Sequence, residues 1–392
     1  MMSKFIPLIC LGLLAMTACQ TVPSVPDTPE TSNQVSETLI NRTEVIAVVN
    51  TQVNAVDLEQ QAAEWGYSLK SKEKLEGLDM YVMTFNCPPG IDPHIAALEL
   101  ERLQPDSTVG VNHKYDLNLG KAVFAETPHT YADTLISWPK SGCEAQLPIG
   151  IIDGGVSQAF LRRHGERISY KSFIKGNPPQ SAIEHGTAIA SILLEPNRLH
   201  QGQYYVAAVV SEDEKGTPFS GLFPMLKALD WMISSDVRVV NISLAGPKNP
   251  ALEKAMKRAS DKGLIIVAAV GNDGKNASPR YPAAFDNIIA ATAVNKDGKI
   301  YDKAVRGAHV DFAAPGVQIY VPDEDKGQFV SGTSIAAPFV TAMIASHAQG
   351  GEDISVNDVK KFLAQSTQDL GENGRDPVYG MGLIKAKNDC SF

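Results

Sequence analysis

The second half of the chain alternates short apolar strands with helices, and this alternation restricts the possible fold more than any other feature. The expected strands are residues 147–152, 204–210, 237–243, 264–270 and 287–294, and the expected helices are residues 187–194, 221–234 and 251–262. The second helix shows apolar residues at helical spacing, namely Leu222, Leu226, Leu229 and Ile233. Strands that are apolar almost throughout and separated by helices predict a parallel sheet covered on both faces.

Polar side chains follow two of the expected strands. Asp153 comes directly after the strand over 147–152 and enters a glycine turn, and Asn272 follows the strand over 264–270 through Gly271. Ligands of such sheets bind at the carboxyl ends of the strands. Asp153 and Asn272 are therefore candidates for one functional site.

A candidate nucleophile lies nearer the C-terminus. Residues 332–338 read Gly-Thr-Ser-Ile-Ala-Ala-Pro and precede an apolar run of helical length, residues 339–349. A serine at the mouth of a buried helix, behind a glycine that allows close backbone approach, suits a nucleophile. The positive end of the helix dipole favours negative charge that develops there. Taken alone, Ser334 also fits a plain helix N-cap.

A histidine completes the set. His185 leads into the helix expected over 187–194. Asp153, His185 and Ser334 thus follow the chain order of the subtilisin-type triad, which differs from the trypsin and α/β-hydrolase orders. Asn272 is a residue type that supplies the side-chain donor of an oxyanion hole. Individually these residues also fit turns and helix caps, but jointly they indicate acyl transfer.

These motifs resemble the subtilase family of subtilisin-like serine proteases, from about residue 146 to 386. The resemblance implies an α/β fold with a subtilisin-like parallel sheet covered by helices on both faces. It implies a serine endopeptidase that cleaves protein substrates through an acyl-enzyme, with Asp153, His185, Ser334 and Asn272 as catalytic residues. The residues it places in substrate binding are Ser243, Leu244, Ala245, Gly246, Ala269, Val270 and Gly271.

The chain departs from the family pattern in two places. Gly154 follows the aspartate where the family usually has serine or threonine, and this removes a hydroxyl beside the carboxylate. The span from His185 to residue 210 is shorter than in secreted subtilisins and lacks their asparagine-rich calcium loop. We therefore predict no metal site and no cofactor; calcium binding is left open but is not predicted.

Two charged features are expected beside the substrate cleft. Arg280 falls where the resemblance places the base of the primary specificity pocket, so it either favours acidic substrate side chains or is solvated. Residues 211–216, Ser-Glu-Asp-Glu-Lys-Gly, are expected to form an acidic rim. The rim either selects basic residues further along the substrate or is only a charged loop.

Residues 44–117 are expected to form a separate small domain. Strands over 44–49, 68–75, 79–85 and 109–115 and helices over 55–65 and 92–103 give the order βαββαβ of a small sandwich. The domain resembles the subtilase prodomain, which implies an intramolecular chaperone and inhibitor whose last strand occupies the active site. A generic spacer domain is the alternative. Residues 118–145 are expected to be a linker containing the processing region, and residues 146–392 the catalytic domain.

The N-terminus carries export signals. Residues 1–18 are expected to be a signal peptide, because Lys4 precedes an apolar run too short to span a bilayer. Residues 16–19, Met-Thr-Ala-Cys, resemble a bacterial lipobox, which implies lipidation of Cys19; simple signal cleavage is the alternative. Residues 19–43 are expected to be a disordered tether.

An exported lipoprotein of the cell envelope is therefore expected, on the periplasmic side or in the outer membrane. Its lipid anchor would make the membrane a partner, and cleavage near residues 117–130 would release the catalytic domain. The net charge of −9 argues against a nucleic-acid partner. Expected partners are protein or peptide substrates, and the protein is expected to be a monomer.

Cysteine usage agrees with export. Of five cysteines, Cys10 would leave with the signal peptide and Cys19 would be acylated. In an oxidising compartment we expect Cys143 and Cys390 to pair and to join the two ends of the catalytic domain. Cys87 is expected to be an inert strand residue.

Two other functional classes remain to be weighed. A catalytically silent, peptide-binding envelope lipoprotein with a subtilisin-like fold would keep the cleft without the chemistry, but the intact triad residues argue against it. An α/β-hydrolase is disfavoured because residues 332–336, Gly-Thr-Ser-Ile-Ala, lack the second glycine of a nucleophile elbow.

Overall fold

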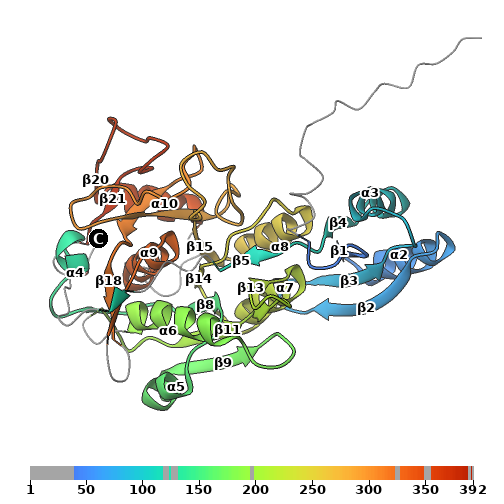
Figure 1. The fold of residues 1–392 in the computed structure, drawn as a ribbon, viewed down its shortest axis with the longest axis horizontal. Helices are drawn as coiled ribbons and strands as arrows, with labels where there is room; N and C mark the ends of the chain where they lie inside the picture. The colour runs from blue at the N-terminus through green and yellow to red at the C-terminus, as the bar shows by residue number, and fades with distance from the viewer. Residues whose placement is uncertain are drawn as a thin grey trace, which may run out of the picture.

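The computed structural model describes residues 39–117, 123–124, 131–194, 198–322, 327–347, 355–386 and 390. A nine-stranded sheet organises the larger C-terminal part of these residues, and a four-stranded sheet organises the smaller N-terminal part (Figure 1). The expected signal peptide, Cys19 and most of the expected tether lie outside the described residues. None of the helices among the described residues is long and apolar enough to cross a bilayer.

The large sheet has the strand order β20-β21-β17-β16-β15-β14-β8-β11-β9. Its strands are β8 (Ile149–Asp153), β9 (Ile168–Ser172), β11 (Tyr204–Ala208), β14 (Val239–Ile242), β15 (Ile265–Ala269), β16 (Ile289–Val294), β17 (Phe312–Pro315), β20 (Thr367–Gln368) and β21 (Leu383–Ile384). Every neighbouring pair is parallel except β20 with β21. The predicted parallel sheet is confirmed, with one antiparallel strand added at its edge.

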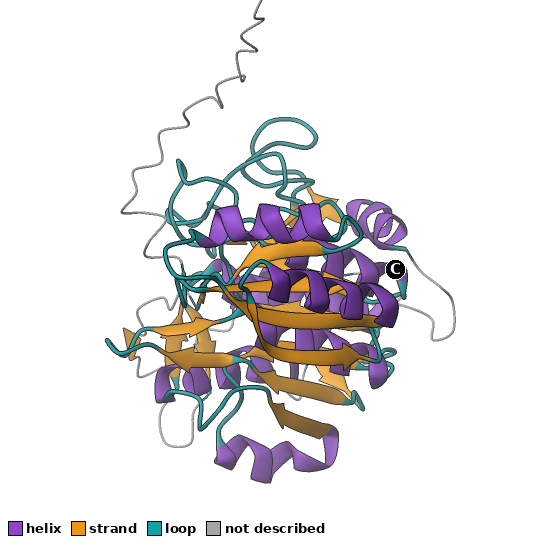
Figure 2. Ribbon diagram, turned by 90° about the vertical axis from the view of Figure 1, so that its right-hand side faces the viewer, coloured by secondary structure: helices purple, strands orange, loops and turns teal. Residues whose placement is uncertain are grey.

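Helices cover both faces of this sheet (Figure 2). Ile149 and Ile151 of β8 belong to the core formed with α6 (Gln180–Leu194) and α9 (Thr333–His347). Ile152 belongs to the opposite core, formed with α7 (Leu222–Ser234) and α8 (Pro250–Asp261). A strand buried on both faces has no polar side, which explains its uninterrupted apolar sequence.

One helix begins earlier than the sequence predicts. α6 starts at Gln180 instead of Thr187, which places His185 in its second turn and not at its head. The expected boundary was wrong because it followed the onset of apolar residues, whereas the helix starts with polar residues. α9 (Thr333–His347) has Ser334 in its first turn and Pro338 just past that turn.

The N-terminal part has the expected βαββαβ order. Its elements are β1 (Glu44–Val49), α2 (Gln52–Glu64), β2 (Ser68–Leu75), β3 (Met80–Asn86), α3 (Pro93–Leu103) and β4 (Thr108–Val111). They build an antiparallel sheet in the order β2-β3-β1-β4. The closing strand expected over 109–115 is interrupted: β4 ends at Val111, and β5 (Tyr115–Asp116) pairs instead with β13 (Pro218–Ser220).

The central strand β1 of the small sheet is buried on both faces. Val45, Ala47 and Val49 face the core under α2 and α3. Ile46 and Val48 join the core that also contains α7 and α8. The N-terminal part therefore shares an apolar core with the larger part and does not sit apart on a flexible linker.

A polar contact reinforces this junction at the start of α8. Asn249 caps the helix by accepting from the N–H groups of Ala251 and Leu252 at 3.1 and 3.2 Å. Its amide nitrogen then donates to Val111 O at 2.8 Å and approaches His113 Nδ1 at 3.2 Å. Since the amide carries the hydrogens, His113 Nδ1 must be an unprotonated acceptor.

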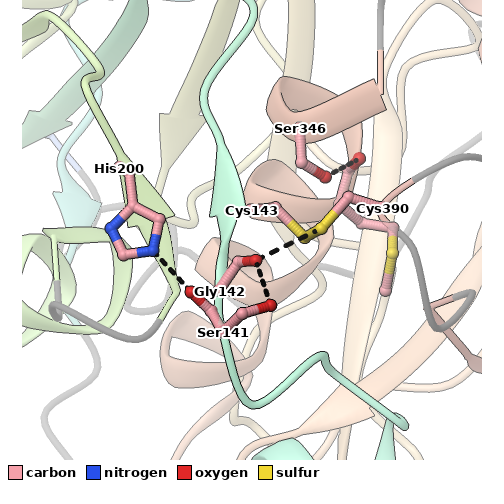
Figure 3. Close-up of a disulfide and its surroundings, with 7 residues drawn as sticks. Ser141, Gly142, Cys143, His200, Ser346 and Cys390 are labelled. Atoms are coloured by element: carbon pink, nitrogen blue, oxygen red, sulfur yellow. Dashed lines mark hydrogen bonds between the residues drawn. A yellow bond between two sulfur atoms is a disulfide. The ribbon is translucent and has the colours of Figure 1, made fainter.

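A disulfide joins Cys143, in β7 (Cys143–Glu144), to Cys390, across 247 positions of sequence. Figure 3 shows the bridge beside the turn of Ser141 and Gly142, where His200 Nε2 donates to Ser141 O at 2.6 Å. The bridge links the start of the large domain to its end. Cys87 is free, and burial raises the pKa of its thiol to about 11, which keeps it protonated at neutral pH.

Removal of the bridge should destabilise the fold. We expect the double variant Cys143→Ser, Cys390→Ser to lose about 2–5 kcal/mol of unfolding free energy, because the unfolded chain regains the freedom that the cross-link removes. Denaturant unfolding followed by circular dichroism measures the loss. Cys87→Ser is the matched control and should change stability much less; equal effects of the two variants would contradict this role of the bridge.

Acid should weaken the junction at His113. Burial lowers the pKa of His113 to about 4 from 6.5, because a protonated ring would lose its hydration there, and the nearby His94 adds to the effect. The contribution of neutral His113 to the unfolding free energy is complete above pH 6.5. It is lost as pH falls from 6.5 to about 4, which lowers the unfolding free energy by about 3 kcal/mol. His113→Gln keeps an acceptor without titrating, so the pH dependence of its unfolding free energy should be shallower over this window. Identical pH dependence of the two proteins would show that His113 carries no such linkage.

Candidate active site

Three of the predicted residues form a continuous hydrogen-bonded line. His185 Nδ1 lies 2.9 and 3.1 Å from the two carboxylate oxygens of Asp153, and His185 Nε2 lies 3.1 Å from Ser334 Oγ. All three side chains are buried. They come from the end of β8, the second turn of α6 and the first turn of α9, and the first and last of them are 181 positions apart in the sequence.

The turn after Asp153 needs glycine for packing. A Cβ on Gly154 would lie 2.3 Å from Ala182 O in α6, and a Cβ on Gly186 would lie 1.9 Å from Gly155 O. The helix that carries His185 therefore lies directly on the turn that follows Asp153. In place of the hydroxyl usual in the family, the Gly154 N–H donates to Asp153 Oδ1 at 2.6 Å.

The first turn of α9 is held from outside the helix. Pro338 has no N–H to donate to Ser334 O, four residues earlier. Ser243 Oγ lies 3.3 Å from that carbonyl and donates to it instead. Ser243 in turn accepts from Asn241 Nδ2 at 2.9 Å, and Asn241 Oδ1 accepts from Thr341 Oγ1 at 3.3 Å. This buried chain fixes the backbone of Ser334 to the end of β14.

Asn272 is oriented by Thr333. Its Oδ1 accepts from the Thr333 N–H and from Thr333 Oγ1, both at 3.0 Å, and Thr333 Oγ1 accepts from the Gly271 N–H at 3.1 Å. A Cβ on Gly332 would lie 3.2 Å from Asn272 Nδ2 and 3.0 Å from Ser334 Oγ. Asn272 Nδ2 and Ser334 Oγ therefore border the same small space, which the missing side chain of Gly332 leaves open.

A groove beside this centre is occupied by β5. The Asp116 N–H donates to Ala245 O at 2.8 Å, and the Ala245 N–H donates to Asp116 O at 3.2 Å. On its other side β5 pairs with β13, so it lies as a strand between the two walls. Tyr115 is fully buried, and its ring takes the space that a Cβ on Gly246 would need.

Comparison with known proteins identifies the family. The family model described as "Subtilase family" matches residues 145–382. The chain belongs to the subtilase family.

Curated relatives align with the same region of this subtilase. It is 29% identical over 264 residues to the minor extracellular protease Epr of Bacillus subtilis, an alignment that covers 64% of this chain and 39% of Epr. It is 27% identical over 260 residues to subtilisin DY of Bacillus licheniformis, covering 62% of this chain and 90% of subtilisin DY. The chain thus spans less than half of Epr but nearly all of subtilisin DY.

Solved structures share the fold over a longer stretch. Fervidolysin of Fervidobacterium pennivorans, a keratinolytic enzyme related to subtilisin, has a TM-score of 0.69 at 17% identity and covers 88% of this chain and 60% of its own. The epidermin leader peptide processing protease of Staphylococcus aureus has a TM-score of 0.64 at 16% identity, covering 87% and 97%. Residues 146–392 are only about 63% of the chain, so the shared fold includes part of the N-terminal domain.

The other predicted substrate residues of the subtilase have mixed positions. Ala245 and Gly246 form backbone hydrogen bonds at the groove, to Asp116 and Tyr281 respectively. Leu244 and Val270 are fully buried in the core under α7 and α8, and Ala269 belongs to the core with α9. The Ser243 hydroxyl is directed to α9 and not to the groove.

Two structural parts of the site were not predicted from the sequence. Thr333 was read only as part of a helix start, and its bridging of Gly271 and Asn272 has no sequence signal. The hairpin of β12 (Val210–Glu212) and β13 walls the groove opposite Ala245; the sequence predicts an acidic rim over residues 211–216 but not the two strands that flank it. Within the described ranges, no group of three or more His, Cys, Asp or Glu side chains is arranged to hold a metal ion.

The glycine after Asp153 should not tolerate the usual family residue. We expect Gly154→Ser to lower the unfolding free energy by about 1–3 kcal/mol, because its Cβ would overlap the backbone of Ala182. Gly165→Ser is the matched control, since no atom lies within 4 Å of the Cβ position there. Chemical denaturation compares the two, and a Gly154→Ser protein as stable as the control would show that α6 can yield at this point.

Proposed function

We propose that this subtilase is a serine endopeptidase in which Ser334 is the nucleophile, His185 the general base and Asp153 the residue that orients the histidine. The observation that carries the proposal is the unbroken line from Asp153 through His185 to Ser334 Oγ. A protein that only captured peptides would have no need of this alignment.

The mechanism follows from the weak nucleophilicity of a neutral serine, which needs a base to remove its proton. Ser334 Oγ attacks the scissile carbonyl while His185 Nε2 takes its proton, and Asp153 stabilises the imidazolium that forms. The imidazolium then protonates the leaving amine, and the acyl group remains on Ser334. Water, deprotonated by His185, attacks this ester and releases the carboxylate product, which restores Ser334.

The oxyanion of each tetrahedral intermediate needs donors. We assign this role to Asn272 Nδ2 and to the backbone N–H of Ser334, at the positive end of α9. Thr333 supports the assignment because it holds Asn272 Oδ1 and leaves the amide nitrogen on the side of Ser334. Loss of one such donor typically costs about 10²–10³ in kcat.

Substrates are proposed to bind as an added strand between Ala245 and β13, where β5 now lies. An extended peptide there gains main-chain hydrogen bonds on both sides. Unfolded or loop segments of proteins can adopt this conformation, which agrees with an endopeptidase.

The N-terminal domain is proposed to act as an intramolecular inhibitor that the enzyme removes from itself. β5 fills the groove, and β6 (Val123–Phe124) pairs with β19 (Gln328–Val330), which ends four residues before Ser334 in the sequence. In the sequence, residues 118–122 connect these two paired segments. This supports self-cleavage between Leu117 and Val123, within the processing region expected from the sequence.

Export and anchoring complete the proposal. The lipobox-like residues at Cys19 favour an envelope lipoprotein that is monomeric and needs no cofactor. Cys19 lies on the N-terminal side of the proposed cleavage, so processing would separate the catalytic domain from its anchor.

N-terminal sequencing of the purified protein beside its Ser334→Ala variant tests this function. The wild-type catalytic domain should begin between residues 118 and 123, while the variant stays one chain and its peptide hydrolysis falls roughly 10⁶-fold. Ser346→Ala, a buried serine of the same helix, is the control and should process normally. Processing and hydrolysis that survive in Ser334→Ala would refute the assignment.

A further inference from the structure

The backbone contacts of β5 do not depend on its side chains. Asp116 exchanges both main-chain hydrogen bonds with Ala245, and Asp116 and Tyr115 pair with Phe219 and Ser220 of β13. Any extended peptide can form these bonds. Selection among peptides must therefore come from what the groove offers to the side chains.

The groove offers a positive charge at Asp116. Arg280 Nη2 donates to Asp116 Oδ2 at 3.2 Å. The arginine is anchored within the catalytic domain, because its Nε lies 3.2 Å from Asp273 Oδ2 and its Cγ lies 3.0 Å from the Cβ position of Gly271. Nε is buried without an aligned hydrogen-bond acceptor, so the guanidinium is not fully satisfied by its own domain. The side chain expected at the base of the primary pocket thus reaches the peptide residue that pairs with Ala245.

The surroundings of Asp116 affect the charge of an acidic side chain at this position. Burial raises the pKa of Asp116, and the Asp273 carboxylate adds to this effect. Arg280 is the main group that opposes it, with Lys114 adding less. The Asp116 side chain is 43% exposed, so water screens these effects in part, and Arg280 is the nearest cation that favours a carboxylate at this position.

The carboxylate of Asp213 lies beside Lys114, two positions before Asp116. Lys114 Nζ lies 2.8 Å from Asp213 Oδ2 and 4.9 Å from the centre of the Phe219 ring. Asp213 Oδ1 accepts from the N–H groups of Lys215 and Thr217 at 3.0 and 2.9 Å, which leaves Oδ2 for the lysine. The hydrogen bond from Lys114 and these backbone bonds lower the pKa of Asp213 to about 2. Asp213 belongs to the predicted acidic rim.

Resting on the proposed function, we propose that Arg280 and Asp213 select substrates by charge. Arg280 favours an acidic side chain at the position of Asp116, and Asp213 favours a basic side chain two residues before it. Residues two apart in an extended segment point to the same side, so an extended substrate in this register presents both charges as Lys114 and Asp116 do. The substrate class is a protein segment with a basic and an acidic residue separated by one buried, ring-sized residue.

Hydrogen exchange in the uncleaved Ser334→Ala chain tests the contact without requiring catalysis. Arg280→Glu should raise the exchange rate of the Asp116 amide roughly tenfold, and adding Asp116→Arg should restore protection by reversing both charges. Arg163→Glu, an exposed arginine on α5 (Gln158–His164), is the matched control and should leave the rate unchanged. Equal exchange in all variants, or no recovery in the charge swap, would overturn the proposal.

Peptide hydrolysis by the processed enzyme tests selection directly. The probes are quenched fluorescent octapeptides with the sequence of residues 114–121, Lys-Tyr-Asp-Leu-Asn-Leu-Gly-Lys, with Asp changed to Lys, or with the first Lys changed to Glu. Each change should lower kcat/KM roughly tenfold, and Arg280→Glu should reverse the preference at the Asp position.

The outcomes separate the two proposals. Hydrolysis of every peptide with the same kcat/KM would refute charge selection and leave the protease function intact. Failure to cut any of them would refute the proposed function, and the exchange measurement alone would then decide whether Arg280 selects charge in this groove.

Discussion

The attachment of the first turn of α9 to two strand ends is the constraint on which the site depends. Ser243, after β14, replaces the helical hydrogen bond that Pro338 cannot make, and Asn272, after β15, accepts from Thr333. Ser334 is therefore fixed through its own carbonyl and through its neighbour. Because α9 is buried along its whole length, a shift of this turn would have to move the core as well.

The histidine is positioned from the other side by close backbone packing. α6 lies on the Gly154–Gly155 turn with no space for a Cβ at Gly154 or Gly186. β8 and β14 are neighbours in the sheet. The strands that follow β8 in the chain, β9 and β11, lie on one side of it, and those that follow β14 lie on the other side, so Asp153 is at a point where the strand order reverses. Such points leave a crevice at the carboxyl ends of the strands, and the line of three side chains lies there.

The N-terminal domain is tied to the same elements. Its sheet shares a core with α7 and α8, and its chain continues from β4 past His113 into the groove. The strand that fills the groove is thus held by an apolar interface behind it and by opposite charges on both sides. An interface of this kind suits a segment that must stay in place until it is cut.

Much of this architecture can be predicted from the sequence, and the failures have physical causes. The buried strands and the order Asp153, His185, Ser334 are local signals and were readable. The break after Val111 could not be predicted. Every second residue from Val109 to Tyr115 is buried, as in one continuous strand, but the chain leaves the small sheet after Val111 and pairs with β13 from Tyr115. The roles of Gly154 and Thr333 depend on contacts with Ala182, Gly271 and Asn272, which no local pattern reports. The same holds for Arg280, whose partner Asp116 lies 164 residues away.

Labelling with a fluorophosphonate, mapped by mass spectrometry, tests the central claim most directly, because the reagent reacts with a serine only when a neighbouring base activates it. The account predicts one adduct in the processed protein, on Ser334, and its loss in His185→Ala with the fold intact. An adduct on another serine, or labelling of Ser334 that is unchanged in His185→Ala, would contradict the proposed alignment of Asp153, His185 and Ser334.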